Sequence, residues 1–324
     1  MPVTLAQAKV GMADKIDQQV IDMFRRDSFI LDAITFDNVV SPGTGGSTLT
    51  YGYTQLKTPS TAQGRAINGE YTAGEAERTT KSVNLKIMGG AFEVDRVLED
   101  TAAKSEIAFQ LQQKTKAVSN KFHNDFINGS STAKGDNTSF DGLKKLLKGA
   151  STECTPDVAI DLSTSAKCKE NADEFVYQLD TFLGTLSERP QMLLMNSKAL
   201  SAVKTVARHL GYFSQDEDAF GRKVDTYDGI QLRDMGQYYN GTNTVDIIDT
   251  NDTDGTTDIY AVTFAMDACH GASPTGNKVI KTYMPNMSLP GAVKKGEVEL
   301  VSAIVLKDTT KCGVLHKVQV KPAG

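Results

Sequence analysis

The chain has 324 residues, 40% of them hydrophobic, and a formal net charge of −5. This length can bury a sizeable core in two lobes or in one domain with insertions. The acidic balance argues against wrapping nucleic acid by neutralising its phosphates, and it gives no reason to expect a membrane surface as partner. No apolar run approaches the roughly 18 residues of a membrane span, and the N-terminus lacks the apolar centre of a signal peptide. We therefore expect a protein of cytoplasmic origin.

The first 46 residues combine an apolar helical pattern with a glycine-rich hinge. Apolar residues fall at helical spacing between Asp14 and Phe24, and a second apolar patch follows from residue 29 to residue 36. This segment is either an N-terminal core helix or an extended arm that clamps a neighbouring molecule. We favour the arm because so much apolar surface precedes the first sheet element. Its expected contact residues are Phe24, Arg25, Arg26 and Phe29.

A long polar excursion follows, between two stems that alternate like paired strands. The stems are Thr48–Thr54 and Ser82–Met88, and the residues between them hold Leu56, Ile67 and Tyr71 as their only large apolar side chains. Compact domains rarely carry loops beyond roughly 12–15 residues without a functional reason, and a lone two-stranded arm is marginal in water. We therefore expect residues 47–96 to form an extended hairpin that lies on another copy of the chain. Its expected contact residues are Lys57, Arg65, Glu70, Glu75, Glu77 and Arg78.

The hairpin leads into a long helix. Asp100-Thr101 offers an N-cap, no Gly or Pro occurs before Gly129, and Asn128-Gly129 is a helix stop. About 29 helical residues would span roughly 43 Å, well above the mean helix length of about 11–12 residues. The pattern therefore predicts a strut, and an apolar stripe at spacings of four and seven predicts its buried face: Ile107, Leu111, Val118, Phe122 and Phe126.

An α/β block and a series of strands complete the chain. The block consists of a helix over residues 172–186, a buried strand at Met192–Met195 and a helix over residues 198–210. Residues 212–220 read as an acidic loop. The predicted strands are 229–232, 244–248, 258–266, 278–284, 297–306 and 313–320. The fold class is α+β, with helices first and antiparallel strands last.

No pattern predicts a catalytic, metal or cofactor site. The scattered Cys154, Cys168, Cys269 and Cys312 indicate reduced thiols, with a Cys154–Cys168 disulfide or a metal site as lesser alternatives. Cys269 and His270 are neighbours in a strand, so their side chains point to opposite faces and do not form a nucleophile and base. Residues 248–255 superficially resemble a calcium loop, but the glycine falls at the wrong position and the closing acid is missing. We expect a protein that is not an enzyme.

The order of arm, hinge, polar hairpin, strut helix, α/β block and returning strands resembles the major capsid proteins of tailed bacteriophages. These share the Hong Kong 97-like fold with encapsulin shells. Tyr53–Val83 is similar to the family's extended loop, Phe92–Arg96 to the strand before its spine helix, and Glu106–Gly129 to that helix. Further similar segments are Phe140–Leu143, Arg189–Asn196, Val224–Leu232 and Thr256–Phe264.

This resemblance implies an N-terminal arm and hinge (1–46), an extended hairpin loop (47–96), a peripheral domain with the spine helix (97–148), an axial domain (149–275) and peripheral strands (276–324). It implies a coat protein that forms hexamers and pentamers and closes into an icosahedral shell around double-stranded phage DNA. The expected location is the virion, assembled in the host bacterial cytoplasm.

The implied partners are further copies of the chain, a separate scaffolding protein, a portal and a decoration protein, with the short N-terminal arm as the alternative source of scaffolding. The packaged DNA would be enclosed without sequence-specific binding, and no membrane or cofactor takes part. Lys57 lies in the hairpin, but no matching acid and asparagine accompany it, so we expect no covalent cross-link. The alternatives are an encapsulin-like compartment with an enzyme as cargo, and a tail or baseplate protein that builds tubes or rings.

Overall fold

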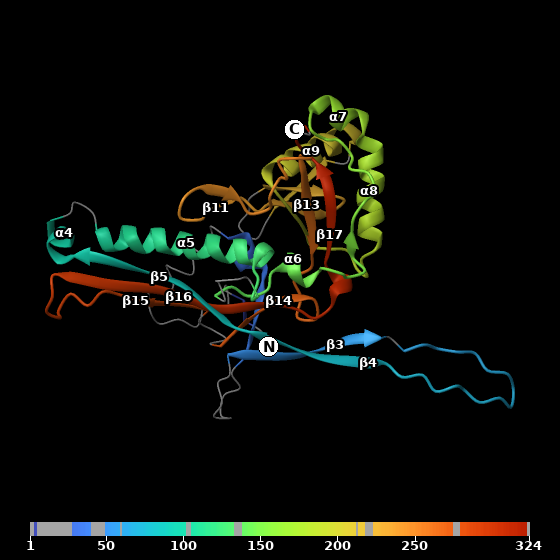
Figure 1. The fold of residues 1–324 in the computed structure, drawn as a ribbon, viewed down its shortest axis with the longest axis horizontal. Coiled ribbons are helices and arrows are strands. Elements are labelled where there is room, and N and C mark those ends of the chain that lie inside the picture. Colours follow the sequence, from blue (N-terminus) through green and yellow to red (C-terminus); the bar gives the residue numbers. More distant parts are fainter. Residues whose placement is uncertain are drawn as a thin grey trace.

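A long sheet, a mixed sheet and a projecting hairpin make up the structure, a computed structural model (Figure 1). The mixed sheet and its helices stand to one side of the long sheet, and the hairpin projects away from both (Figure 1). The structure describes residues 3–4, 28–39, 49–58, 60–101, 105–132, 138–211, 213–217, 223–274 and 279–322.

The long sheet is organised around its longest strand, β16. The first part of β16 lies between β5 and β15, and its last part pairs with β14, which continues to β2 and β1. The sheet is antiparallel except where β14 runs parallel to β2. The strand bounds are β1 Val3–Thr4, β2 Thr35–Asn38, β5 Lys86–Asp95, β14 Cys269–Ser273, β15 Ile280–Tyr283 and β16 Val293–Leu306.

Helix α5 (Glu106–Asn128) runs along β5 and β16 (Figure 1). Val118, Phe122 and Phe126 are buried as the apolar stripe predicts, and Leu111 is partly buried against the same core. Ile107 is half-buried. Short helices flank this region: α3 Phe29–Ala33, α4 Arg96–Thr101 and α6 Leu143–Leu146.

The predicted start of the long helix is wrong. Asp100 and Thr101 end the separate helix α4, and α5 begins after its N-cap Ser105, whose hydroxyl accepts a hydrogen bond from the Ala108 amide. The Glu99 carboxylate also accepts from the amides of Glu106 and Ile107, at 2.8 and 3.0 Å. An anion at a helix N-terminus is favourable because it faces unpaired N–H groups and the positive end of the helix dipole.

The mixed sheet has the order β6-β17-β13-β7-β10-β9-β8, and β7–β10 and β6–β17 are its parallel pairs. Helices α7, α8 and α9 pack against it. The strand bounds are β6 Glu153–Cys154, β7 Met192–Met195, β8 Phe213–Glu217, β9 Lys223–Tyr227, β10 Ile230–Asp234, β13 Thr256–Val262 and β17 Gly313–Gln319. The helix bounds are α7 Ser165–Glu170, α8 Ala172–Gly184, α9 Ser197–Leu210 and the 3-10 turn η1 Thr309–Lys311.

Strand β7 divides the interior into two cores, because successive side chains of a strand point to opposite faces. Leu193 and Met195 pack into the core beneath α8 and α9. Met192 and Leu194 belong to the other core, which the mixed sheet shares with α5 and the long sheet. A strand buried on both faces is a continuous apolar run, which is why this one was predicted from the sequence.

Several predicted boundaries differ from the structure. The second hairpin stem is divided between β4 (Glu77–Asn84) and β5, since β5 pairs with β16 and not with β3 (Thr50–Thr58). The acidic loop prediction for residues 212–220 is wrong over β8, which pairs with β9. The grouping of residues 276–324 is wrong for β17, which joins the mixed sheet, and β14 belongs to the long sheet and not to the axial segment.

Candidate functional site

The hairpin of β3 and β4 is the most exposed part of the described structure. The strands pair in continuous register from Thr50–Asn84 to Leu56–Arg78, the register shifts before the pair Thr58–Glu77, and the strands carry a tip over residues 60–76. Every described residue of this tip is exposed, and Ile67 has 93% of its side-chain surface in water. A hairpin of this length without a core of its own has a surface available for another molecule.

The structure does not bring the predicted hairpin contacts together in one cluster. Arg65, Glu70 and Glu75 lie in the exposed tip, whereas Glu77 and Arg78 lie in β4. The Arg65 guanidinium turns back on the tip: it donates to the Gly69 carbonyl at 3.1 Å and lies 5.4 Å from the centre of the Tyr71 ring. The backbone of Lys57 lies in β3, and its side chain is outside the described residues.

The predicted arm contacts fall largely outside the described structure, which resumes at Ser28 and so leaves out Phe24, Arg25 and Arg26. Phe29 begins α3 and packs on the core of its own chain, with the Arg233 guanidinium 5.4 Å from its ring centre. Its other ring neighbour is His123 of α5, at 5.9 Å. For Phe29, the core-helix interpretation is therefore the one that the structure supports.

The sequence indicates a structural role for His123 beside Phe122, but it does not predict that this histidine anchors α3. The Ser28 hydroxyl caps α3 and is hydrogen-bonded to Nε2 of the buried His123. Burial lowers the pKa of His123 from its ordinary 6.5 to about 4, so the imidazole is neutral at physiological pH. The predicted buried stripe of α5 was the available signal, since position 123 borders it.

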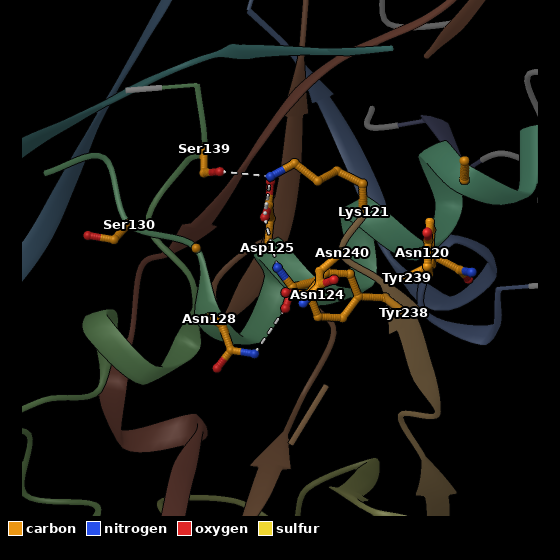
Figure 2. A pocket seen from close by; sticks show the side chains of 12 residues that line it. Asn120, Lys121, Asn124, Asp125, Asn128, Ser130, Ser139, Tyr238, Tyr239 and Asn240 are labelled. Carbon is orange, nitrogen blue, oxygen red and sulfur yellow. Dashed lines mark hydrogen bonds and ion pairs between the residues drawn. The ribbon is translucent and has the colours of Figure 1, made fainter. Parts of the chain in front are cut away.

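A polar groove lies beside the C-terminal half of α5 (Figure 2). It has a volume of about 510 Å³, and its opposite wall is formed by β11 (Gln237–Tyr239) and the turn residue Asn240 of the ribbon that β11 makes with β12 (Thr244–Asp246). Asn120, Asn124 and Asn128 project from successive turns of the helix into it (Figure 2). Amides spaced in this way can donate to and accept from polar groups of a partner.

The floor of this groove holds a buried carboxylate, Asp125. Lys121 donates to its Oδ1 at 3.0 Å, and Oδ2 has no partner among the described residues. Burial raises the Asp125 pKa above its ordinary value, in opposition to the Lys121 charge. The chain passes closely at the end of the helix: a Cβ at Gly129 would lie 2.3 Å from the Phe140 carbonyl oxygen, and a Cβ at Gly142 would lie 2.6 Å from the Asp125 carbonyl oxygen. The second approach explains the glycine in the segment 140–143.

A histidine between two carboxylates joins three strands of the mixed sheet. His316 of β17 bonds Asp258 of β13 at 2.8 Å through Nδ1, and it bonds Glu153 of β6 at 3.2 Å through Nε2. The hydrogen bond to Asp258 is the largest cause of its raised pKa. This arrangement is an ion-pair cluster that stabilises the sheet.

Helix α4 and the start of α5 lie with the β15–β16 connection at the end of the long sheet that is farthest from the hairpin tip (Figure 1), and these segments carry exposed apolar residues. The backbone amide of Arg96 in α4 bonds the carbonyl of Ala292 just before β16, which brings two chain segments together there. Single exposed apolar residues are ordinary, but a group at one end indicates a contact surface. Its exposed members are Val97, Phe109, Tyr283, Met284, Leu289 and Val293.

The described residues contain no group of three or more His, Cys, Asp or Glu arranged to hold a metal. All four cysteines are free thiols, and burial raises the pKa of Cys269 and Cys312. Within the described ranges, no helix has the length and hydropathy to span a membrane.

Solved structures of shell proteins share this fold. The chain resembles the holo-SrpI encapsulin complex from Synechococcus elongatus PCC 7942, with a TM-score of 0.61, 15% identity, and 99% of this chain and 97% of that chain covered. It resembles the capsid of a native GTA particle, with a TM-score of 0.55, 11% identity, and 95% of this chain and 92% of that chain covered. It also resembles the capsid of Myoviridae phage XM1, with a TM-score of 0.54, 11% identity, and 90% of this chain and 91% of that chain covered. The fold is therefore the Hong Kong 97-like fold of phage capsids and encapsulins.

The family follows from the sequence itself. Residues 5–253 match the family model of the SU10 major capsid protein. The chain belongs to this family of major capsid proteins. A search of curated protein sequences gives no match.

Proposed function

We propose that this capsid protein assembles as hexamers and pentamers into an icosahedral shell that encloses double-stranded phage DNA. The observation that carries the proposal is the hairpin, which has an ordered strand ladder but an entirely exposed tip. Such an element gains its contacts when it lies across another copy of the chain. The acidic net charge of −5 suits a container that confines DNA without binding it tightly.

Two surfaces would contribute to assembly. The charged residues of the hairpin form exposed pairs that are each worth about 0–1 kcal/mol, so their effect depends on repetition around the shell. The apolar end of the long sheet would add burial of roughly 25 cal/mol for each Å² removed from water. The shell would form in the host bacterial cytoplasm and become part of the virion, with a separate scaffolding protein, a portal and a decoration protein as partners.

Removal of the hairpin tests the proposal. Deleting residues 57–77 and inserting an Asn-Gly turn joins Leu56 to Arg78, which already face each other in the ladder. We expect a folded, soluble subunit that forms no shells in electron micrographs. The control replaces residues 240–243 of the β11–β12 turn with Asn-Gly, a similar change in a short ribbon, and keeps assembly. Shells formed by the hairpin deletion would contradict the proposed role of the hairpin.

An encapsulin-like compartment is a second candidate, because the SrpI encapsulin complex covers nearly the whole chain at a TM-score of 0.61. The two candidates differ in content and not in fold. Particles purified from infected or expressing cells would be treated with nuclease and then opened. Protected double-stranded DNA supports the capsid, whereas a packaged enzyme without DNA supports the compartment.

A further inference from the structure

The two strands of the hairpin are attached in different ways to the body of the subunit, by which we mean the long sheet, the mixed sheet and their helices. β4 continues through the buried Leu85 into β5, so the backbone itself fixes its root. The root of β3 is held by one backbone bond, from the Leu85 amide to the Leu49 carbonyl at 2.8 Å, and by side chains. The Tyr51 hydroxyl donates to Oδ2 of Asp37 on β2 at 2.6 Å, and the Tyr51 ring stacks on Tyr53 at 6.4 Å.

The surface beneath Tyr51 is one face of the long sheet. Asp37 faces Ala272 and His270 faces Val305 in the strand registers, so alternation places Asp37 and His270 on the same face. The His270 ring meets the Tyr51 ring edge-on at 5.8 Å. Lys307, which follows β16, places its ammonium group 5.8 Å from the Tyr51 ring centre. The charged and titratable groups around His270 are therefore Asp37, Tyr51 and Lys307.

His270 is completely buried, and neither of its ring nitrogens has a hydrogen-bond partner within the described ranges. An unpaired neutral imidazole at such a site is costly, and a charged one costs more. Burial is the main cause that lowers the His270 pKa to about 4, and the Lys307 charge lowers it further, whereas the Asp37 carboxylate and the backbone of Ala268 act in the opposite direction.

We propose that Tyr51, Asp37 and His270 form a latch that sets the direction in which the hairpin leaves the body, and that protonation of His270 opens it. An imidazolium must donate to an acceptor. Asp37 is the carboxylate beside it, and this carboxylate already accepts from Tyr51. A charged His270 therefore competes with Tyr51 for Asp37 and removes the side-chain hydrogen bond that ties β3 to β2, while the backbone bond at Leu49 remains. This role belongs to the single subunit and is separate from shell formation.

A distance measurement on unassembled subunits, isolated by size exclusion, tests the latch. Spin labels are placed at Gly64→Cys, where a side chain meets no atom within 4 Å, and at Tyr177→Cys on α8, which is 71% exposed. The partly exposed Cys154 is replaced by Ser, and the other three cysteines are buried. The measured quantity is the distribution of distances between the hairpin tip and the body.

At neutral pH we expect Tyr51→Phe and Asp37→Ala to broaden this distribution, because each removes one partner of the hydrogen bond. Tyr53→Phe is the matched control, since it removes a hydroxyl from the stacked neighbour that does not bond Asp37, and it should leave the distribution unchanged. If Tyr51→Phe gives the wild-type distribution, the latch does not exist, even if deletion of the hairpin still prevents assembly.

Repeating the distance measurement at acidic pH tests the role of His270 separately. On acidification to about pH 4 we expect the wild-type distribution to broaden towards that of Tyr51→Phe. His270→Gln lacks the imidazole that titrates at this position and should not respond, whereas His123→Gln, which affects the α3 anchor, should respond like wild type. Circular dichroism recorded on the same samples reports global unfolding. An equal response of wild type and His270→Gln would overturn the role of His270, and the neutral-pH comparison would still decide on Tyr51 and Asp37.

Discussion

The hairpin and β7 of the mixed sheet are both built from paired strands, yet they depend on different forces. All four residues of β7 are buried, and they pack into two separate cores. Most of β4 is exposed on both faces, so its order comes from the ladder to β3 and from its root. Backbone hydrogen bonds contribute only modest net stability in water, whereas apolar burial drives folding. The body should therefore fold without help from the hairpin. The order and direction of the hairpin should depend on the contacts at its root and on neighbouring molecules.

The largest expected effect is in the core. Phe122 of α5 is fully buried between Phe126 and Phe140, with ring centres at 6.3 and 5.8 Å. Phe122→Ala should lower the free energy of unfolding by about 3–5 kcal/mol in urea titrations, because it leaves a cavity among these rings. Ile67→Ala at the exposed tip is the matched control and should have no measurable effect. An equal loss of unfolding free energy in both variants would contradict the claim that the body, and not the hairpin tip, carries the stability.

Acid should weaken the body through His123. Its folded pKa of about 4 lies below the ordinary 6.5, so its neutral form stabilises the fold above pH 6.5, and this stability is lost as the pH falls towards 4. The loss amounts to about 3 kcal/mol at most. Urea midpoints of wild type and His123→Gln should converge as the pH falls from 7 to about 4. A constant difference between the two proteins would show that His123 does not titrate in this range.

The next largest loss of stability should come from a variant at a buried polar junction beside α9. The Asn196 side chain caps α9 by accepting from the Ala199 amide at 2.8 Å. It also donates to the Ile248 carbonyl and to the hydroxyls of Thr250 and Thr257. Asn196→Ala should cost about 2 kcal/mol in thermal or urea unfolding, since it removes the cap and leaves buried acceptors unpaired. Asn196→Ser retains a capping oxygen without adding a buried charge and loses the amide donors, so a loss equal to that of Ala would assign the effect to the donors.

The His316 cluster should give a smaller effect of opposite pH dependence. Its raised pKa means that the charged form stabilises the fold fully below pH 6.5, and this stability disappears as the pH rises through the raised folded value. His316→Gln should lower stability by about 1 kcal/mol at pH 6 and by less in alkaline solution, because the cluster is partly open to solvent. A penalty that grows with pH would contradict the ion-pair account.

The predictable parts of the fold were those specified by local patterns. The buried strand β7, the helix α9 and the stripe Val118, Phe122 and Phe126 all follow from composition and spacing over a few residues. The pairing of β17 with β13 was not predictable in this way, because it depends on contacts between distant segments. The start of α5 was also missed, since Glu99 caps it from a preceding helix.

The candidate site also has a part that the sequence predicts and a part that depends on contacts between distant segments. The length and polarity of the hairpin were visible in the sequence, because they follow from composition. Its root was not, because Tyr51, Asp37 and His270 are brought together by pairing among β2, β14 and the hairpin. The groove beside α5 likewise requires the β11–β12 ribbon as its second wall.

The smallest effect on stability should come from the hairpin tip, and it sharpens the contrast with the core. Arg65 bonds the Gly69 carbonyl and lies over the Tyr71 ring, and all three residues are exposed. Because exposed interactions of this kind contribute little, Arg65→Ala should change the free energy of unfolding by less than about 0.5 kcal/mol. Light scattering should nevertheless show slower or reduced assembly, since the tip would meet a neighbouring copy. Arg65→Lys retains the charge but not the planar group, so it separates an effect of charge from an effect of tip shape. Normal assembly by Arg65→Ala would remove this residue from the proposed contact while leaving the rest of the hairpin in place.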